Sequence, residues 1–204
     1  MVTEIRIYAE GGGDSAHTKQ FLRQGFGTFL RELSSKARER RVRWRIVLCG
    51  SRSDALHAFR TAMSQHTEAF NVLLVDSESA VRSTPWGHLE GCGEWTGAHP
   101  PNDQCHFMAQ AMEAWFIADA EVVKQFYGQG FRANALPQQA DVEQIKKNDL
   151  EPCLRNATRN TTKGEYHKGK HAWQLLQRIN PAKVRVSAQH CERLFTTLTE
   201  KIES

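Results

Sequence analysis

Three acidic residues that directly follow predicted strands are the strongest candidates for chemistry in this sequence. Glu10 follows the β-rich segment 5–9, and Asp76 and Glu78 follow the apolar segment 72–75. If these strands are parallel neighbours, the carboxylates meet at the carboxyl edge of the sheet, where open α/β folds place their sites. Gathered carboxylates repel one another unless a cation neutralises them, and Mg²⁺ prefers carboxylate, water and phosphate oxygens. The pattern predicts a Mg²⁺ or Mn²⁺ site for phosphoryl chemistry, with ordinary turn residues at strand ends as the alternative.

A glycine-rich loop at 11–13 follows Glu10 and precedes a predicted helix. Glycine accepts positive φ and lacks a Cβ, so the loop permits a phosphate to approach backbone N–H groups at the helix start. The loop has neither the G-x-G-x-x-G spacing nor a following Lys-Ser/Thr pair, which argues against Rossmann dinucleotide and Walker sites. Asp14 comes next, as a cap of the helix or a second metal ligand, and we favour the cap.

A second group of candidates lies in the segment 158–171, TRNTTKGEYHKGKH. Its positive and aromatic side chains suit a polyanionic backbone, because Lys and Arg bind phosphates while Tyr and His stack or donate. The residues expected to bind nucleic acid are Arg159, Lys163, Tyr166, His167, Lys168 and Lys170. Lys168 is also assigned to charge stabilisation in a phosphoryl transition state. The alternatives are a solvated loop and a His167/His171 zinc pair, which lacks a third ligand at local spacing.

An acid amid apolar residues stands in the segment MEAWF at 112–116. Burying the Glu113 carboxylate without a partner is costly, so the sequence predicts that it is paired. Two interpretations stay open, a role in the site or a salt bridge to a nearby arginine.

The elements that must position these residues alternate between strand and helix along the first 80 residues. This alternation predicts an α/β fold with a parallel sheet and right-handed crossovers. The predicted strands are 5–9, 45–49, 72–75 and 106–109, and one helix carries the apolar stripe from Phe21 to Leu33. Segment 83–105 reads as a long loop, and helices are expected near 112–119, 147–157, 171–179 and 188–202, the last capped by Ser187.

Length and composition indicate one globular domain without a membrane segment. The chain has 204 residues, 40% hydrophobic and 25% charged, and a net charge of +4, which permits an anionic partner. Five scattered cysteines without a C-x-x-C pair favour reduced thiols in a cytoplasmic protein. No signal peptide and no apolar run of about 20 residues is seen. We expect a single domain at 1–204, with an α/β core at 1–120 and a mainly helical extension at 121–204.

Several of these segments resemble a known family. A strand ending in Glu10-Gly11 and a later strand ending in an acid-x-acid pair are similar to the Toprim domain of topoisomerases, primases and OLD-family nucleases. The ordered segments IRIYAEGGGDS, CGSR-D, LLVDSE, MEAWF-AD and ATRNT-KGEYHKGKHA resemble a bacterial Toprim-like family, number 4276 in the series of domains of unknown function. The resemblance implies a Toprim-like (Rossmann-like) sheet with a C-terminal helical extension. It implies that Asp76 and Glu78 hold Mg²⁺, that Glu10 is an acid, base or ligand, and that Glu113 lies near the metal.

The resemblance leads us to expect a Mg²⁺-dependent nuclease that hydrolyses DNA or RNA. The residues expected to be catalytic are Glu10, Asp76, Glu78, Glu113 and Lys168. Relatives of the OLD type act in anti-phage defence beside an ABC-type ATPase, and this chain has no Walker motif, so a separate ATPase partner is implied. The alternatives are a non-cleaving module that binds nucleic acid or the ATPase, and an enzyme acting on a small nucleotide. The oligomeric state stays open, a homo-oligomer included.

Overall fold

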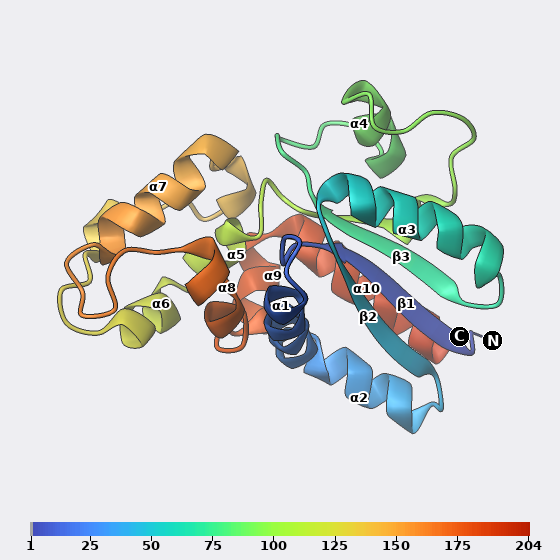
Figure 1. Cartoon of the computed structure of the whole chain (residues 1–204), viewed down its shortest axis with the longest axis horizontal. Helices are drawn as coiled ribbons and strands as arrows, with labels where there is room; N and C mark the ends of the chain where they lie inside the picture. Colours follow the sequence, from blue (N-terminus) through green and yellow to red (C-terminus); the bar gives the residue numbers. More distant parts are fainter. Residues whose placement is uncertain (1) are drawn as a thin grey trace.

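The computed structural model describes residues 2–204 and has a central sheet of parallel strands with helices on both faces (Figure 1). The strands are β1 (Glu4–Glu10), β2 (Arg43–Gly50), β3 (Phe70–Asp76) and β4 (Cys105–Met108). Their spatial order is β2-β1-β3-β4, and each neighbouring pair is parallel. The predicted α/β fold with a parallel sheet is therefore confirmed, and the arrangement is Rossmann-like.

Two helical layers bury the sheet. One face carries α1 (Ala16–Phe29), α2 (Arg31–Glu39) and α10 (Gln189–Glu203), and the other carries α3 (Arg52–Gln65) and α4 (Pro85–Gly91). Strand β3 is covered on both faces. Val72 and Leu74 pack against the layer of α1, α2 and α10, and Leu73 and Val75 pack against the layer of α3 and α4. Side chains alternate between the faces of a strand, so a strand covered on both sides needs a continuous apolar run.

The C-terminal half is mainly helical, as predicted. Its helices before α10 are α5 (Glu113–Ala118), α6 (Ala120–Tyr127), α7 (Lys147–Thr158), α8 (Lys168–Leu176) and α9 (Pro181–Ser187). Short 3₁₀ turns are η1 (Asn102–Gln104), η2 (Ala133–Ala135) and η3 (Val142–Gln144). Helix α8 lies against α1 (Figure 1), whereas α10 returns to the sheet and packs on β4. The chain thus brings the segment before α8 back to the carboxyl edge of the sheet.

Three local expectations differ from the structure. The one helix predicted from the apolar stripe between Phe21 and Leu33 is two helices in the structure. Leu30 ends α1 and begins α2, and the apolar stripe continues across it into the same core. The predicted loop 83–105 contains α4, which Thr84 caps ahead of Pro85. Ser187 ends α9 and does not cap α10, whose N-cap Ala188 makes no side-chain bond. Within residues 2–204, no helix combines the length and apolarity required to cross a membrane.

Candidate active site

Glu10 and Asp76 end the two central strands, β1 and β3, and so lie side by side. The chain leaves β1 for β2 on one side, whereas β3 and β4 lie on the other. The crevice outside the strand ends at such a reversal is where open α/β sheets bind ligands. Here the backbone N–H of Asp76 donates to Glu10 Oε2 at 3.1 Å. The sequence-based expectation that these acids meet at one sheet edge therefore holds.

Glu78 joins these two acids. Glu10, Asp76 and Glu78 each offer an oxygen, and the three oxygens lie within 4.8 Å of one another. Glu78 has a φ of 67°, which is uncommon for a residue with a side chain, and its N–H donates to the Gln110 carbonyl at 2.9 Å. Three hard oxygen donors at this spacing fit a divalent cation such as Mg²⁺ or Mn²⁺. The predicted metal ligands are thus brought together by the fold.

Lys168 sits between two buried acids at the same edge. Its Nζ lies 3.7 Å from Asp76 Oδ2 and 3.4 Å from Glu113 Oε1. Glu113 is only 3% exposed and opens α5. Its partner is this lysine and not the arginine proposed from the sequence, although the prediction that it is paired is correct. Lys168 therefore bridges Glu113 and Asp76, one of the predicted metal ligands.

Tyr166 also binds Glu113, and this corrects its expected role. Its side chain is fully buried, and its hydroxyl donates to Glu113 Oε1 at 3.0 Å. A side chain enclosed by protein has no face for a base to stack on, so the predicted nucleic-acid contact by Tyr166 is wrong. The alternation of basic and aromatic residues did not reveal that this ring points inward, because residues 159–167 form turns and bends in which side-chain direction has no regular period.

The other basic candidates stay outside this cluster. Arg159, Lys163, His167 and Lys170 are exposed on the protein surface. Lys163 lies over the ring of Phe126, 5.0 Å from its centroid. The His171 ring contacts the Tyr127 hydroxyl at 2.9 Å, and its Nδ1 accepts from the His167 N–H at 3.1 Å. These bonds give the His171 ring a structural role, whereas the bond from His167 uses its backbone and the His167 side chain is exposed.

Two cations that the sequence analysis did not single out face Glu78. Arg52, at the start of α3, lies 3.7 Å from Glu78 Oε1 and 2.6 Å from Glu94 Oε2. Lys147 also pairs with Glu78, and its backbone N–H donates to the side chain of Gln110 at 3.1 Å. Arg52 lies just after the end of β2, and Glu10 ends β1, so the position of Arg52 next to a strand end was the signal in the sequence that could have identified it.

The charges of this cluster leave room for a cation. Five carboxylates (Glu10, Asp76, Glu78, Glu94 and Glu113) face three basic side chains (Arg52, Lys147 and Lys168). With every carboxylate ionised, two negative charges are in excess, and a divalent cation would neutralise them. Burial raises the pKa of Asp76 to about 7, although Lys168 favours its ionised form. Burial also raises the pKa of Glu10, which indicates that ionising these groups without a cation is costly.

We expect Mg²⁺ to stabilise the protein more at about pH 8 than at about pH 5.5. The pKa of Asp76 is about 7 in the folded chain against an ordinary 3.8, so without metal the stability from this group falls as the pH rises between these values. Mg²⁺ needs the ionised carboxylate, so its stabilisation grows over the same range. Thermal unfolding with Mg²⁺ and with EDTA measures the difference. Equal shifts at both pH values, or an unchanged pH dependence in Asp76→Asn, would contradict the assignment.

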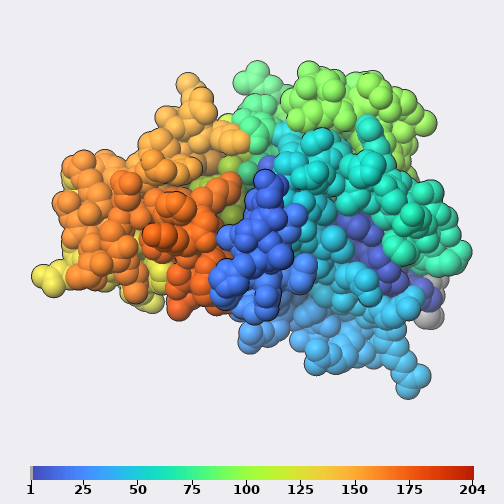
Figure 2. Space-filling model, in the orientation of Figure 1, coloured from blue at the N-terminus to red at the C-terminus, as the bar shows by residue number. Residues whose placement is uncertain are grey.

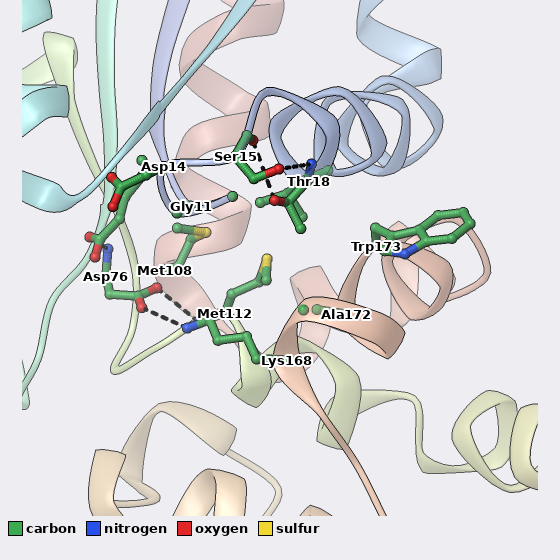
Figure 3. A pocket seen from close by; sticks show the side chains of 16 residues that line it. Gly11, Asp14, Ser15, Thr18, Asp76, Met108, Met112, Lys168, Ala172 and Trp173 are labelled. Atoms are coloured by element: carbon green, nitrogen blue, oxygen red, sulfur yellow. Dashed lines mark hydrogen bonds and ion pairs between the residues drawn. The ribbon is translucent and has the colours of Figure 1, made fainter. Parts of the chain in front are cut away.

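A cavity of about 380 Å³ opens beside the acids and includes Glu10, Asp76 and Lys168 in its wall (Figure 3). The glycine loop forms its rim, and a side chain at Gly12 would collide with the backbone of Lys19, with its Cβ 2.9 Å from the Lys19 Cα. Gly12 has a φ of 86°, so glycine is required there on both counts. Ser15, and not Asp14, caps α1.

The comparison with protein families covers almost the whole chain. A family model described as "Domain of unknown function (DUF4276)" matches residues 9–199. No curated protein and no solved structure matches the chain. The match includes every residue of the acidic and basic cluster described above.

Proposed function

The chain belongs to the DUF4276 family, and we propose that it is a Mg²⁺- or Mn²⁺-dependent nuclease that hydrolyses phosphodiester bonds of DNA or RNA. One observation carries the proposal: Glu10, Asp76 and Glu78 converge at the reversal of strand order beside Lys168. Carboxylates that hold a divalent cation next to a lysine are suited to phosphoryl chemistry. The relation to Toprim and OLD-family nucleases, inferred from the order of motifs in the sequence, belongs to this proposal.

Each side chain receives a role from its surroundings. Asp76 and Glu78 would hold the cation, which supplies charge stabilisation and lowers the pKa of a bound water. Glu10 has its pKa raised by burial, so it is suited to accept the proton of the attacking water or to complete the ligand set. Lys168 would face the phosphate oxygens, and its charge is maintained because Glu113 and Asp76 together outweigh the effect of burial and raise its pKa. Glu113 and Tyr166 position this lysine.

The surface favours a polymer over a mononucleotide. Arg159, Lys163 and Lys170 are exposed in the segments that precede and begin α8, and Lys170 lies two residues after Lys168, which lines the cavity. Exposed cations beside a phosphodiester site suit the backbone of a longer strand. A non-cleaving module that binds nucleic acid is the alternative. An ATPase partner acting in trans and a role in anti-phage defence are proposed from the resemblance to OLD-type systems alone.

The deciding experiment is cleavage of plasmid, single-stranded DNA and tRNA with Mg²⁺, Mn²⁺ or EDTA. We expect cleavage only with metal, and a fall of roughly 100-fold or more in Glu10→Gln, comparable with the loss of a catalytic acid or base. Glu68→Gln is the matched control, because Glu68 is exposed just before β3, at the opposite edge of the sheet. Binding of these nucleic acids without cleavage in any metal would favour the non-cleaving module instead.

A further inference from the structure

We propose that the cavity beside the acids binds one unstacked nucleobase next to the phosphate that is cut, so that the substrate is single-stranded or locally unpaired. The proposal rests on the nuclease function above and names the substrate of that site. Its starting point is the position of the cavity, whose polar end is formed by Glu10, Asp76 and Lys168 themselves. A ligand with its phosphate at the metal ligands must therefore place its next group inside the cavity or across its mouth.

Two helices form the opposite walls. Helix α1 contributes Thr18 and Leu22 together with its N-cap Ser15, about one turn apart, and α8 contributes Gly169, Ala172 and Trp173. Figure 3 shows Thr18 and Trp173 on these facing helices, with Asp76 on the far side of the cavity. In Figure 2 the surface is recessed where the start of α1 (blue) meets the orange segment that includes α8. The two small residues on α8, Gly169 and Ala172, leave the hollow open.

The lining suits the flat face of a base. The apolar lining of the cavity consists of Leu22, Met108, Met112 and Trp173. The Trp173 ring is held by stacking on Phe21, with centroids 4.6 Å apart and an angle of 19°. Aromatic rings and polarisable methionine sulfur both bind aromatic partners well. This combination matches a nucleoside, which joins a flat apolar base to a charged phosphate.

The volume selects an unpaired base. A cavity of about 380 Å³ lies at the lower end of the range for small-molecule sites, roughly 300–1,000 Å³. It holds one nucleoside and not a base pair. A base within a duplex cannot enter such a pocket unless it leaves the stack, which costs unpairing energy that a single strand does not require. The geometry thus points to a single strand, a frayed end or a flipped base.

The first test removes bases from the substrate. Cleavage by the wild-type protein is measured on a set of single-stranded oligonucleotides. Each carries one abasic residue, and its position differs from one oligonucleotide to the next. We expect one position beside the cut at which kcat/KM falls about 5- to 150-fold, the range for losing one base–aromatic stack. Thr18→Phe, which fills the cavity from α1, should lower cleavage of the intact strand but have no further effect on that abasic strand. Gln20→Phe is the control, because Gln20 is exposed on the same helix and does not line the cavity.

A binding experiment separates this proposal from the nuclease function. Nucleoside 5′-monophosphates or ribose 5-phosphate are added stepwise to the protein in the presence of Ca²⁺, and tryptophan fluorescence is recorded. The Trp173→Phe variant shows whether the change in fluorescence comes from Trp173. Quenching by the nucleotides alone, lost in Thr18→Phe, supports the cavity even if polymer cleavage is never seen. If the protein cleaves nucleic acid but no abasic position matters and nucleotides bind no better than ribose 5-phosphate, the cavity proposal is overturned and the nuclease function stands.

Discussion

Replacing Asp76 by asparagine will abolish metal-dependent cleavage, lowering the rate roughly 1,000-fold or more, equivalent to about 4 kcal/mol of barrier. Asp76 lies at the centre of the site, where its Oδ2 is 3.7 Å from Lys168 and its N–H binds Glu10. Asparagine keeps the shape of the side chain and removes the charge that a cation requires. The loss therefore reports on metal binding and not on packing. Single-turnover cleavage at saturating Mg²⁺ measures it.

The same variant will retain its fold and, in EDTA at about pH 8, will be at least as stable as the wild type. The pKa of Asp76 is about 7 in the folded chain, so ionising the group at this pH costs folding free energy. The asparagine carbonyl oxygen still accepts the Met112 N–H, which Asp76 Oδ1 binds at 3.0 Å. Thermal unfolding tests this expectation.

The control is Asp119→Asn, at a buried acid paired with Lys183 and the Asn180 N–H away from the site. We expect this control to lose stability while its folded fraction cleaves normally, the reverse of Asp76→Asn. If Asp76→Asn cleaves at more than about a tenth of the wild-type rate, the barrier has risen by less than about 1.4 kcal/mol. That result would show that Asp76 is not a metal ligand.

Replacing Lys168 by methionine will affect both activity and stability. We expect cleavage to fall roughly 100- to 1,000-fold, as when a preorganised charge donor is removed from a transition state. The variant also leaves Glu113 and Asp76 without their shared cation. Breaking a fully buried pair costs about 3–5 kcal/mol. Because the Lys168 side chain is 48% exposed, water screens the pair, and we expect a smaller loss of about 2 kcal/mol.

A double variant separates these two effects. Lys168→Met with Glu113→Gln removes one of the unpaired charges, so urea unfolding should show stability recovered toward the wild type while cleavage stays low. Tyr166 can still donate to the glutamine carbonyl oxygen, which keeps its buried hydroxyl partnered. If the double variant regains cleavage, Lys168 is only a counter-charge for Glu113. If Lys168→Met cleaves normally while folded, Lys168 does not face the phosphate.

The sheet and its acids were readable from local sequence. The VLLV segment of β3 is apolar because both faces of the strand are covered, and Glu10 and Asp76 were recognisable as residues that follow strands. Parallel strands end at a common edge, so the meeting of these acids followed once the α/β alternation was seen. Helix boundaries were less predictable, because the apolar stripe continues unbroken across Leu30, where α1 gives way to α2.

The sequence by itself determined the parallel α/β fold, the acids at the strand ends and the family. Only the tertiary structure decided which distant side chains complete the site. Lys168 meets Asp76, Tyr166 turns inward to Glu113, and Arg52 and Lys147 face Glu78. Strand and helix patterns depend on neighbours within a few residues, whereas these contacts depend on how α8 lies against α1 and how the chain returns to the sheet edge. That packing comes from the summed burial of apolar side chains along the whole chain, so no single segment encodes it.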